Sequence, residues 1–600
     1  MTTEHPTADP AQPPAKQPRY WFPVLLLGSY WLYHLLCRPF DLDMFSLFVS
    51  RMAVLAVVLV TFPIWWLTSR QLRPFDRTFG VGVVIVAVLA ASFIVVNGAS
   101  VPGLIMVGLP LSYTAATIWL LVARQASKRV WRIGLAVAIC LPLGWLTLFR
   151  WEGLTGDQQN ELRWRWESTA EERFLAVHEP VEPATAPADV VPLSAEAGDW
   201  TGFRGPQRDG VVHGATIATD WRQHPPRLVW RQRVGPAWSS MTVVAGRLFT
   251  QEQRGEREAV VCYDAATGRE LWSHEDTARF SEGVSGIGPR ATPTFDHGRL
   301  YTSGGTGLVN CLDAATGRKT WSRDLVAESG AAAPKFGFWG FSCSPLVVDG
   351  VVIVYAGGEG HEKLWGLDAE SGKTAWSLDA GRNNYSSPQV ATWKDQQQVL
   401  FSGELGLMAV EPASGELLWK APDTLKSSNA MVQPHVLGSN ELVVAADGGL
   451  VRMAVDRDGG GFRLTPRWSA QAKGLRPTFN DFVVHNGAIY GFDEGIFGCL
   501  DLDSGKRTWK RGRYGHGQVL LLADQDVLLV TAESGELVLL AADSAKFREL
   551  AKFQALEGKT WNHPALAHGR LYLRNGEEMA CYELSSMPSG EEQRRRHEQD

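Results

Sequence analysis

Several motifs that commonly carry chemistry are missing from this sequence. Its seven cysteines include no Cys-x-x-Cys pair, no adjacent pair and no Cys-x-x-Cys-His motif, and no His-Glu-x-x-His occurs. These absences exclude the usual paired-cysteine zinc spacings and covalent attachment of a c-type haem. The net charge is −6 and no long basic run precedes the last residues, so the composition argues against a nucleic-acid partner.

One phrase of eleven residues recurs between residues 262 and 509. In each copy an acidic residue is followed by Ser or Thr at +3, Gly at +4 and Trp at +8. The acid can hydrogen-bond the backbone of a turn, Gly supplies a positive φ, and Trp must bury a large ring. One Trp per repeat suits a wedge between neighbouring blades of a β-propeller. The copies are Cys262–Trp272, Cys311–Trp321, Gly366–Trp376, Ala409–Trp419 and Cys499–Trp509.

A hairpin precedes each phrase, as in Ser344–Gly357, so that hairpin and phrase together make a four-stranded blade. Counting these units predicts an all-β, eight-bladed propeller over residues 227–584. The fifth blade has a longer turn at Val455–Phe462, and the seventh, Gln518–Leu550, has lost both Gly and Trp. The last unit, Trp561–Leu584, lacks a fourth strand, which we expect Arg227–Val234 to supply, closing the ring and removing its free edges. The expected docking residues are Trp230, Trp272, Trp321, Trp376, Trp419, Trp468 and Trp509.

Four cysteines occupy one position of the repeat, immediately before the acid. The four copies fall in four different blades on the same inner face, so they cannot pair with one another. We therefore expect small buried core residues rather than a disulfide set. They are Cys262, Cys311, Cys499 and Cys581.

Apolar runs near the N-terminus predict an α-helical membrane domain of about five transmembrane helices within residues 20–150. Basic residues fall before the first run, between the second and third, and between the fourth and fifth. This alternation predicts a cytoplasmic N-terminus and a propeller on the periplasmic side of a bacterial cytoplasmic (inner) membrane. No cleavable signal-peptide pattern follows the first run. The expected spans are 20–37, 52–67, 79–98, 101–123 and 130–149.

The remaining segments have no repeat. Residues 1–19 are polar and Pro-rich and are expected to be disordered, and the charged tail 585–600 to be mobile. Residues 151–197 are expected to form a juxtamembrane helix lying on the membrane, followed by a Pro/Ala linker. Residues 198–226, which contain Phe-Arg-Gly-Pro, are expected to pack under the ring.

The repeats resemble the PQQ-like propeller family, which includes quinoprotein dehydrogenases and the BamB-type propellers of outer-membrane assembly. The resemblance covers roughly residues 198–584 and is carried by the repeated Ala-Ala-Thr-Gly…Trp phrases and by Phe203–Pro206. It implies an eight-bladed fold and little about activity. Five spans before such a propeller also resemble the layout of membrane-bound quinoprotein sugar dehydrogenases, which pass electrons from PQQ to a membrane quinone.

The innermost strands of a propeller start at its central channel, so side chains there converge. Those positions are polar and aromatic here, which predicts a small-molecule pocket at the channel mouth. The alternative is that these groups only solvate and hydrogen-bond the mouth. The candidate ligand-binding residues are Trp238, Arg290, Tyr385, Gln433, Asn480, His516, Trp561, Asn562 and His563, and Asp481 is the candidate catalytic base.

The resemblance implies what a PQQ site would need: Arg for a carboxylate, an aromatic platform and Ca²⁺ held by oxygen ligands. Arg290 would bind the cofactor, Trp238 or Trp561 would stack on it, and Asn480 and Asn562 would ligate calcium. Asp481 would then be the base toward an alcohol. The sequence departs from the dehydrogenases in its short inter-blade loops, in lacking the adjacent-cysteine disulfide and in lacking a haem motif.

Two functions remain open from the sequence. The first is a membrane-anchored binding or scaffold module for a small ligand or an envelope-protein partner. The second is a PQQ- and calcium-dependent quinoprotein dehydrogenase that oxidises an alcohol or sugar and reduces membrane quinone. Uptake of PQQ would distinguish them.

Overall fold

The structure is a computed structural model that describes residues 20–36, 44–95, 103–179, 192–331, 337–393, 395–421, 425–427, 430–459, 461–469 and 474–584. The chain divides into two compact units. The first contains residues 1–152 and 160–167, and the second contains residues 153–159 and 168–600. The expected disordered N-terminus, most of the Pro/Ala linker and the charged tail lie outside the described residues.

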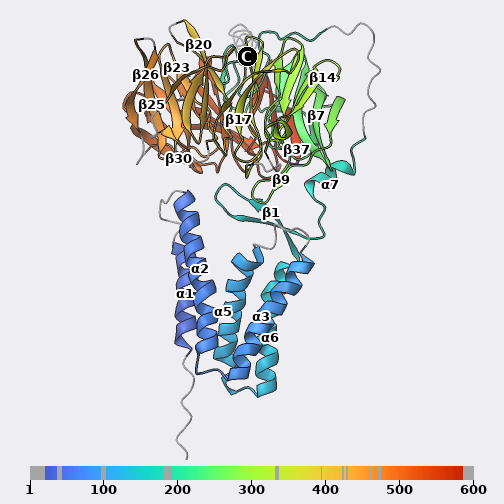
Figure 1. The fold of residues 1–600 in the computed structure, drawn as a ribbon, viewed down its shortest axis with the longest axis vertical. Helices are drawn as coiled ribbons and strands as arrows, with labels where there is room; N and C mark the ends of the chain where they lie inside the picture. Colours follow the sequence, from blue (N-terminus) through green and yellow to red (C-terminus); the bar gives the residue numbers. More distant parts are fainter. Residues whose placement is uncertain are drawn as a thin grey trace, which may run out of the picture. The chain divides into compact units, whose positions relative to one another are not determined.

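The first unit is a bundle of apolar helices (Figure 1). Four described helical stretches are long and apolar enough to cross a membrane, and α1 is a shorter apolar helix of 16 residues. This agrees with the expectation of about five spans; the second, which looked marginal in sequence, is a 25-residue helix. The elements are α1 (Trp21–Leu36), α2 (Met44–Thr68), α3 (Pro74–Ile94), the π-helix η1 (Leu104–Gly108), α5 (Leu109–Val122), the 3₁₀ turn η2 (Ala123–Gln125) and α6 (Lys128–Leu146).

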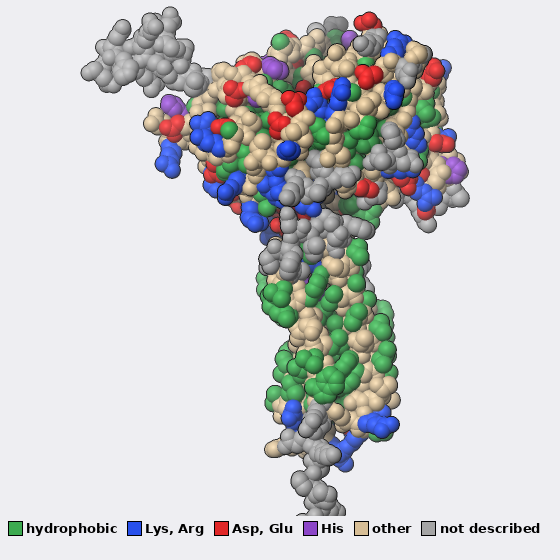
Figure 2. Space-filling model, turned by 90° about the vertical axis from the view of Figure 1, so that its left-hand side faces the viewer, with side chains coloured by type: hydrophobic (Ala, Val, Ile, Leu, Met, Phe, Trp, Pro, Cys, Tyr) green, Lys and Arg blue, Asp and Glu red, His purple; other side chains and the backbone are tan. Residues whose placement is uncertain are grey.

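The basic connections of the bundle meet at one end. Arg132 at the start of α6 pairs with Asp76 at the start of α3, with 2.7 Å between Nε and Oδ1. The guanidinium of Arg124 lies 6.0 Å from the ring of Tyr20, which precedes α1. The three segments that the charge pattern assigns to one side of a membrane are therefore together. On the face shown in Figure 2, hydrophobic side chains dominate the helical unit and Lys and Arg gather at its end.

The segment after α6 contains a hairpin that was not expected, formed by β1 (Phe149–Leu154) and β2 (Asn160–Trp164). A short helix was expected after Arg163–Trp166, and α7 (Ala170–Leu175) lies there, beginning at a capping box between Thr169 and Glu172. Glu171 of α7 is ion-paired with Arg279 at 2.9 Å, so this helix contacts the propeller.

Among the described residues, the second unit contains eight sheets arranged as the blades of a propeller, each with four antiparallel strands, and the sheet of the seventh blade has a fifth strand, β3 (Val211–Val212) (Figure 1). Blades one to four are β5 (Thr242–Val244), β6 (Arg247–Arg254), β7 (Arg257–Asp264), β8 (Glu270–Asp276); β11 (Thr294–Asp296), β12 (Arg299–Ser303), β13 (Leu308–Asp313), β14 (Lys319–Asp324); β15 (Leu346–Val348), β16 (Val351–Ala356), β17 (Lys363–Asp368), β18 (Thr374–Asp379); and β19 (Gln389–Trp393), β20 (Gln396–Gly403), β21 (Gly406–Val410), β22 (Leu417–Lys420).

Blades five to eight follow the same order and confirm the predicted closure. They are β23 (His435–Leu437), β24 (Glu441–Ala446), β25 (Gly449–Asp458), β26 (Gly461–Ser469); β27 (Val483–His485), β28 (Ala488–Asp493), β29 (Ile496–Asp501), β30 (Arg507–Arg513); β31 (Gln518–Leu522), β32 (Val527–Thr531), β33 (Glu536–Ala541), β34 (Glu549–Gln554); and β35 (Ala565–Ala567), β36 (Arg570–Arg574), β37 (Glu578–Glu583) with β4 (Arg227–Arg233). β4 pairs with β37 in register Trp230 to Cys581, so the first strand of the ring completes the last blade.

Tryptophan wedges join the blades as the repeat predicts. Trp376 of blade three donates its indole N–H to Pro412 O of blade four at 2.8 Å. A Cβ built on Gly415 of that turn would lie 2.4 Å from the same ring, so only Gly fits beneath it. The residue opposite the Trp is small in most blades, although Arg452 faces Trp468. Gly366 faces Trp376, and the four repeat cysteines face Trp272, Trp321, Trp509 and Trp230; all four are free and buried.

The long hairpin of blade five explains why Trp419 does not donate its indole N–H to the next blade, as Trp376 does. Its third and fourth strands, β25 and β26, run on into a long hairpin in place of the short acid-to-Gly turn. Trp419 of blade four therefore has no such turn to cover, and it donates to Gln398 Oε1 of its own blade at 2.7 Å.

Candidate functional site

The inner strands begin with three residues that occupy equivalent positions in every blade. The first position forms a ring around one mouth of the channel, which we call the mouth ring. The second position lies between blades, and the third forms a belt inside the channel, which we call the polar belt. The mouth ring is Trp238, Arg290, Ser342, Tyr385, Met431, Phe479, His516 and Trp561, and the polar belt is Ser240, Thr292, Ser344, Ser387, Gln433, Asp481, Gln518 and His563.

The polar belt is a chain of hydrogen bonds from blade to blade. At five of the eight steps around the ring, the side chain of a belt residue accepts from the backbone N–H of the belt residue one blade earlier. Thr292 Oγ1 accepts from Ser240 N at 3.1 Å, and Ser344 Oγ accepts from Thr292 N at 2.9 Å. Asp481 Oδ1 accepts from Gln433 N at 3.3 Å. Gln433 and Asp481, both candidate site residues, therefore help to join neighbouring blades. Aligning the repeats in the sequence could have revealed that they occupy the belt position.

The segment 198–226 enters the ring from the opposite end, as expected for a segment packed under it. Its strand β3 (Val211–Val212) adds in parallel to β31. Arg204, which is 1% exposed and has φ +61°, reaches the polar belt. Its NH1 lies 3.2 Å from Asp481 Oδ1 and 3.0 Å from His435 Nε2. The Phe-Arg-Gly-Pro motif thus places a cation beside the candidate base, which sequence reasoning did not anticipate.

Electrostatics around Asp481 favour a permanent ion pair. Burial raises the pKa of Asp481, but the charge of Arg204 and the bond from His563 outweigh it and hold the pKa below its ordinary value. His563 Nε2 lies 3.1 Å from Asp481 Oδ2. Burial lowers the pKa of His563, and burial together with Arg204 lowers the pKa of His435 to about 3. Both imidazoles are therefore neutral near pH 7, and Arg204 forms the ion pair with Asp481, with the buried Arg208 guanidinium close enough to act on both charges.

One side of the mouth ring is closed by the loop that contains β9 (Ser281–Glu282) and β10 (Gly286–Ile287). Arg290 binds Glu282 at 2.9 Å and also donates to Ser285 Oγ at 2.9 Å. Trp238 donates its indole N–H to Ser285 O at 2.8 Å. The loop therefore brings Arg290 and Trp238 together. Burial lowers the pKa of Arg290 to about 10, against the opposing charge of Glu282.

The other side of the mouth ring is aromatic. The rings of Trp561 and Trp238 lie 4.9 Å apart, and Phe479 lies 5.0 Å from Trp561. Lys559 Nζ sits 4.5 Å from the Trp561 ring. Glu533 accepts from Trp561 Nε1 at 3.0 Å. Glu533 and Lys559 belong to inter-strand turns without repeat identity, so no sequence pattern pointed to them.

The other candidates bond to backbone rather than to one another. Tyr385 donates its backbone N–H to Ala430 O at 2.8 Å, and burial raises the pKa of its hydroxyl. His516 is buried against Phe479, and Gln433 Nε2 donates to Pro388 O at 2.9 Å. Asn480 and Asn562 occupy the second position. Their amide groups donate to Gly517 O at 2.5 Å and Ser239 O at 2.7 Å in the following blades.

The residues assigned to PQQ and calcium do not fit that group. Arg290 is neutralised by Glu282, and Asp481 by Arg204. Calcium takes six to eight oxygen ligands. The amide oxygens of Asn480 and Asn562 are unpartnered, but no cluster of three or more His, Cys, Asp or Glu able to hold a metal occurs among the described residues. We therefore derive no redox step through these side chains.

A buried carboxylate beside the mouth loop gives a testable pH dependence. Burial raises the pKa of Glu258 to about 7, although Gly305 N–H donates to it at 3.1 Å. Folding therefore favours the protonated form, and this stabilisation is complete below about pH 4.5 and is lost as pH rises through 7. We expect Glu258→Gln to remove about 3 kcal/mol of pH dependence in the free energy of unfolding. Urea unfolding of both proteins between about pH 5 and pH 8 measures it; parallel curves would contradict it.

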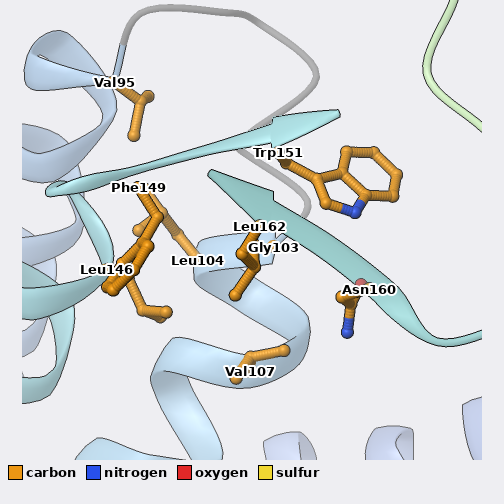
Figure 3. Close-up of a pocket in the computed structure, with 9 residues that line it drawn as sticks. All are labelled: Val95, Gly103, Leu104, Val107, Leu146, Phe149, Trp151, Asn160 and Leu162. Atoms are coloured by element: carbon orange, nitrogen blue, oxygen red, sulfur yellow. The ribbon is translucent and has the colours of Figure 1, made fainter. Parts of the chain in front are cut away.

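The helical unit has a separate cavity of about 70 Å³, lined by Val95, Gly103, Leu104, Val107, Leu146, Phe149, Trp151, Asn160 and Leu162. Figure 3 shows the apolar side chains on one side and Trp151 with Asn160 on the other. The lining is almost wholly apolar and contains no side chain that the sequence predicted for a site.

Comparison with known proteins agrees with the fold. Residues 256–511 match the family model described as outer membrane protein assembly factor BamB. The quinohemoprotein alcohol dehydrogenase from Comamonas testosteroni is similar in structure, with TM-score 0.50 and 14% identity over 66% of this chain and 82% of that chain. BamB from Moraxella catarrhalis is also similar, with TM-score 0.44 and 15% identity over 60% of this chain and 99% of that chain. No curated protein sequence matches this chain.

Proposed function

We propose that this chain, whose C-terminal domain is a PQQ-like β-propeller, is a membrane-anchored binding or scaffold module for a protein of the cell envelope. Apolar helices long enough to span a membrane support the anchoring. The observation that carries the proposal is that the charged side chains of the channel form ion pairs with other side chains of this chain. The Arg204–Asp481 and Arg290–Glu282 pairs leave the channel groups committed to structure, so recognition falls to the outer faces of the ring.

The membrane orientation is part of this proposal. Basic residues at one end of the helical bundle favour the cytoplasmic side for that end, and an odd number of spans then puts the propeller in the periplasm. We expect alkaline phosphatase fused after residue 179 to be active and the same enzyme fused after Arg73 to be inactive. Fusions with the opposite pattern would reverse the orientation, and equal activity at both would contradict a spanning arrangement.

The binding role is tested by photo-crosslinking in intact cells of the native host. A photoreactive residue replaces Asp503, whose side chain is 89% exposed in a turn of blade six, or Ser534, in a turn on the opposite face of the ring. We expect a discrete light-dependent adduct with an envelope protein from one of these faces. The same label at Trp376, which is 7% exposed, is the buried control. Absence of adducts from both faces, extended to exposed positions in each blade, would overturn the proposal.

The dehydrogenase alternative is settled by adding PQQ and Ca²⁺ to the purified full-length protein. We expect no saturable quinone absorbance and no dye reduction with alcohols or sugars. Saturable uptake that is lost in Arg290→Met would instead favour the dehydrogenase and would place the cofactor at the mouth ring.

A further inference from the structure

The tip of the β1–β2 hairpin, residues 153–159, belongs to the same compact unit as the propeller. It is a well-formed turn in its own right. Gln158 N–H donates to Thr155 O at 2.9 Å, Gln159 N–H donates to Thr155 Oγ1 at 3.1 Å, and Gln158 takes a left-handed φ of +58°. The tip therefore presents a fixed backbone shape to whatever it contacts.

The channel mouth holds this turn by its backbone. Leu154 N–H donates to Val284 O of the mouth loop at 2.8 Å, and Leu154 O accepts from Lys559 Nζ at 3.1 Å. Gly156 N–H donates to Glu533 Oε1 at 2.6 Å. Three separate connections of the ring thus supply one acceptor carbonyl, one ammonium and one carboxylate. All three bonds go to main-chain atoms, so they do not depend on the side chains of the turn.

The fit of the turn in the channel mouth also requires glycine, which has no side chain, at two positions of the turn. A Cβ built on Gly156 would lie 2.2 Å from His516 Cδ2, and His516 is buried and held in place. A Cβ on Gly153 would lie 2.3 Å from Val284 O, and Gly153 has φ +128°. Real Cβ atoms do not approach this closely, so both positions select glycine.

The mouth groups are positioned by the ring and not by the turn. Glu533 also accepts from Trp561 Nε1 at 3.0 Å and from His516 N–H at 3.0 Å. Lys559 rests over the rings of Trp561 and Trp238, at 4.5 and 5.5 Å. Groups fixed in this way before a ligand arrives lose little freedom on binding, which is the property of a binding site.

We propose that the channel mouth is a binding site for a glycine-containing turn of a protein chain, and that residues 153–159 are its resident ligand in this chain. The ligand class is a tight turn recognised through its backbone, with glycine facing His516. A partner protein that carries such a turn would compete with the chain's own. The inference rests on the proposed binding role, and it adds the channel mouth, with a stated ligand class, to the outer faces of the ring as a place of recognition.

The test uses full-length protein and a labelled, disulfide-closed peptide of residues 150–163. In Gly156→Val the chain's own turn cannot seat, so we expect this variant to bind the peptide at least about tenfold more tightly than the unmodified protein. Gly82→Val is the matched control, because a Cβ at Gly82 meets nothing within 4 Å. Hydrogen exchange of residues 153–159 reports whether the turn has left the mouth, and Gly156→Ala replaces the valine variant if that one does not fold.

The outcomes separate this inference from the proposed function. Peptide binding that is weakened by adding Lys559→Met, and that is absent for a peptide with Ala in place of Gly156, supports the site. Equal binding to the variant and the unmodified protein, or none to a folded variant whose turn exchanges freely, overturns it. Crosslinks from Asp503, which lies at the other face of the ring, do not depend on the mouth, so they test the binding role separately.

Discussion

Replacing Arg204 with Met is expected to lower the free energy of unfolding of the propeller by about 3–5 kcal/mol. Arg204 and Asp481 have side chains that are 0% and 3% exposed, and their atoms approach to 3.2 Å. Removing the cation takes away the ion-pair partner of the buried Asp481 carboxylate and leaves it the hydrogen bonds from Gln433 N–H and His563. Arg204 NH2 also donates to Phe482 O at 2.7 Å, so that carbonyl loses its partner as well.

Two further proteins make this prediction specific. The double variant Arg204→Met with Asp481→Asn removes both charges and should recover part of the loss. Asp503→Asn breaks an ion pair with Arg452 of similar length, 2.9 Å, but at a side chain that is 89% exposed, and should cost less than about 1 kcal/mol. Denaturant unfolding of the purified protein, followed by tryptophan fluorescence, measures all three. A loss for Arg204→Met no larger than that for Asp503→Asn would show that the pair does not anchor the segment.

Truncating one wedge, Trp376→Ala, is expected to cost about 3–5 kcal/mol. The ring is 7% exposed, covers Gly415 of the next blade and donates to Pro412 O there. Its loss opens a cavity at the interface between blades three and four and leaves that carbonyl without its indole donor. The neighbours cannot close the gap, because Gly366 directly opposite has no side chain to fill it.

The comparison for this variant is Trp166→Ala. The Trp166 side chain is 65% exposed, so its truncation should change the free energy of unfolding by no more than about 0.5 kcal/mol. The same denaturant titration serves both. If Trp376→Ala were as mild as Trp166→Ala, the indoles would not be what holds adjacent blades together, and the mechanical interpretation of the repeat would be wrong.

The blades were predictable from sequence because their information is local. Acid, Gly and Trp lie within eight residues of one another, and the turn that they specify also positions the Trp. Closure through Arg227–Val234 followed from counting strands. The burial of the four repeat cysteines was also predictable, because they share one position of the repeat in four different blades.

The site was only partly predictable because its partners come from outside the repeat. Asp481 was found from its place in the blade, but Arg204 lies 277 residues earlier in a segment with no periodicity. The hairpin at residues 149–164 was missed for a different reason. The alternation of Arg and Trp in Arg163–Trp166 has the period of two that is typical of a strand, yet it was interpreted as an interfacial pattern. Trp164 in β2 stacks on Phe149 of β1, with ring centres 4.3 Å apart.

The pairing of β4 with β37 constrains how the molecule is made. Arg227 and Glu583, which meet in that pairing, are 356 residues apart in the chain. At typical synthesis rates the ribosome needs roughly 20–70 s to travel between them. Throughout that interval β4 has no partner, and by its end seven completed blades form an open arc with two exposed strand edges that could pair with another chain. These strand edges must therefore be shielded during synthesis until β37 pairs with β4. A chain whose synthesis stops shortly before β37 keeps both edges exposed and is prone to aggregate.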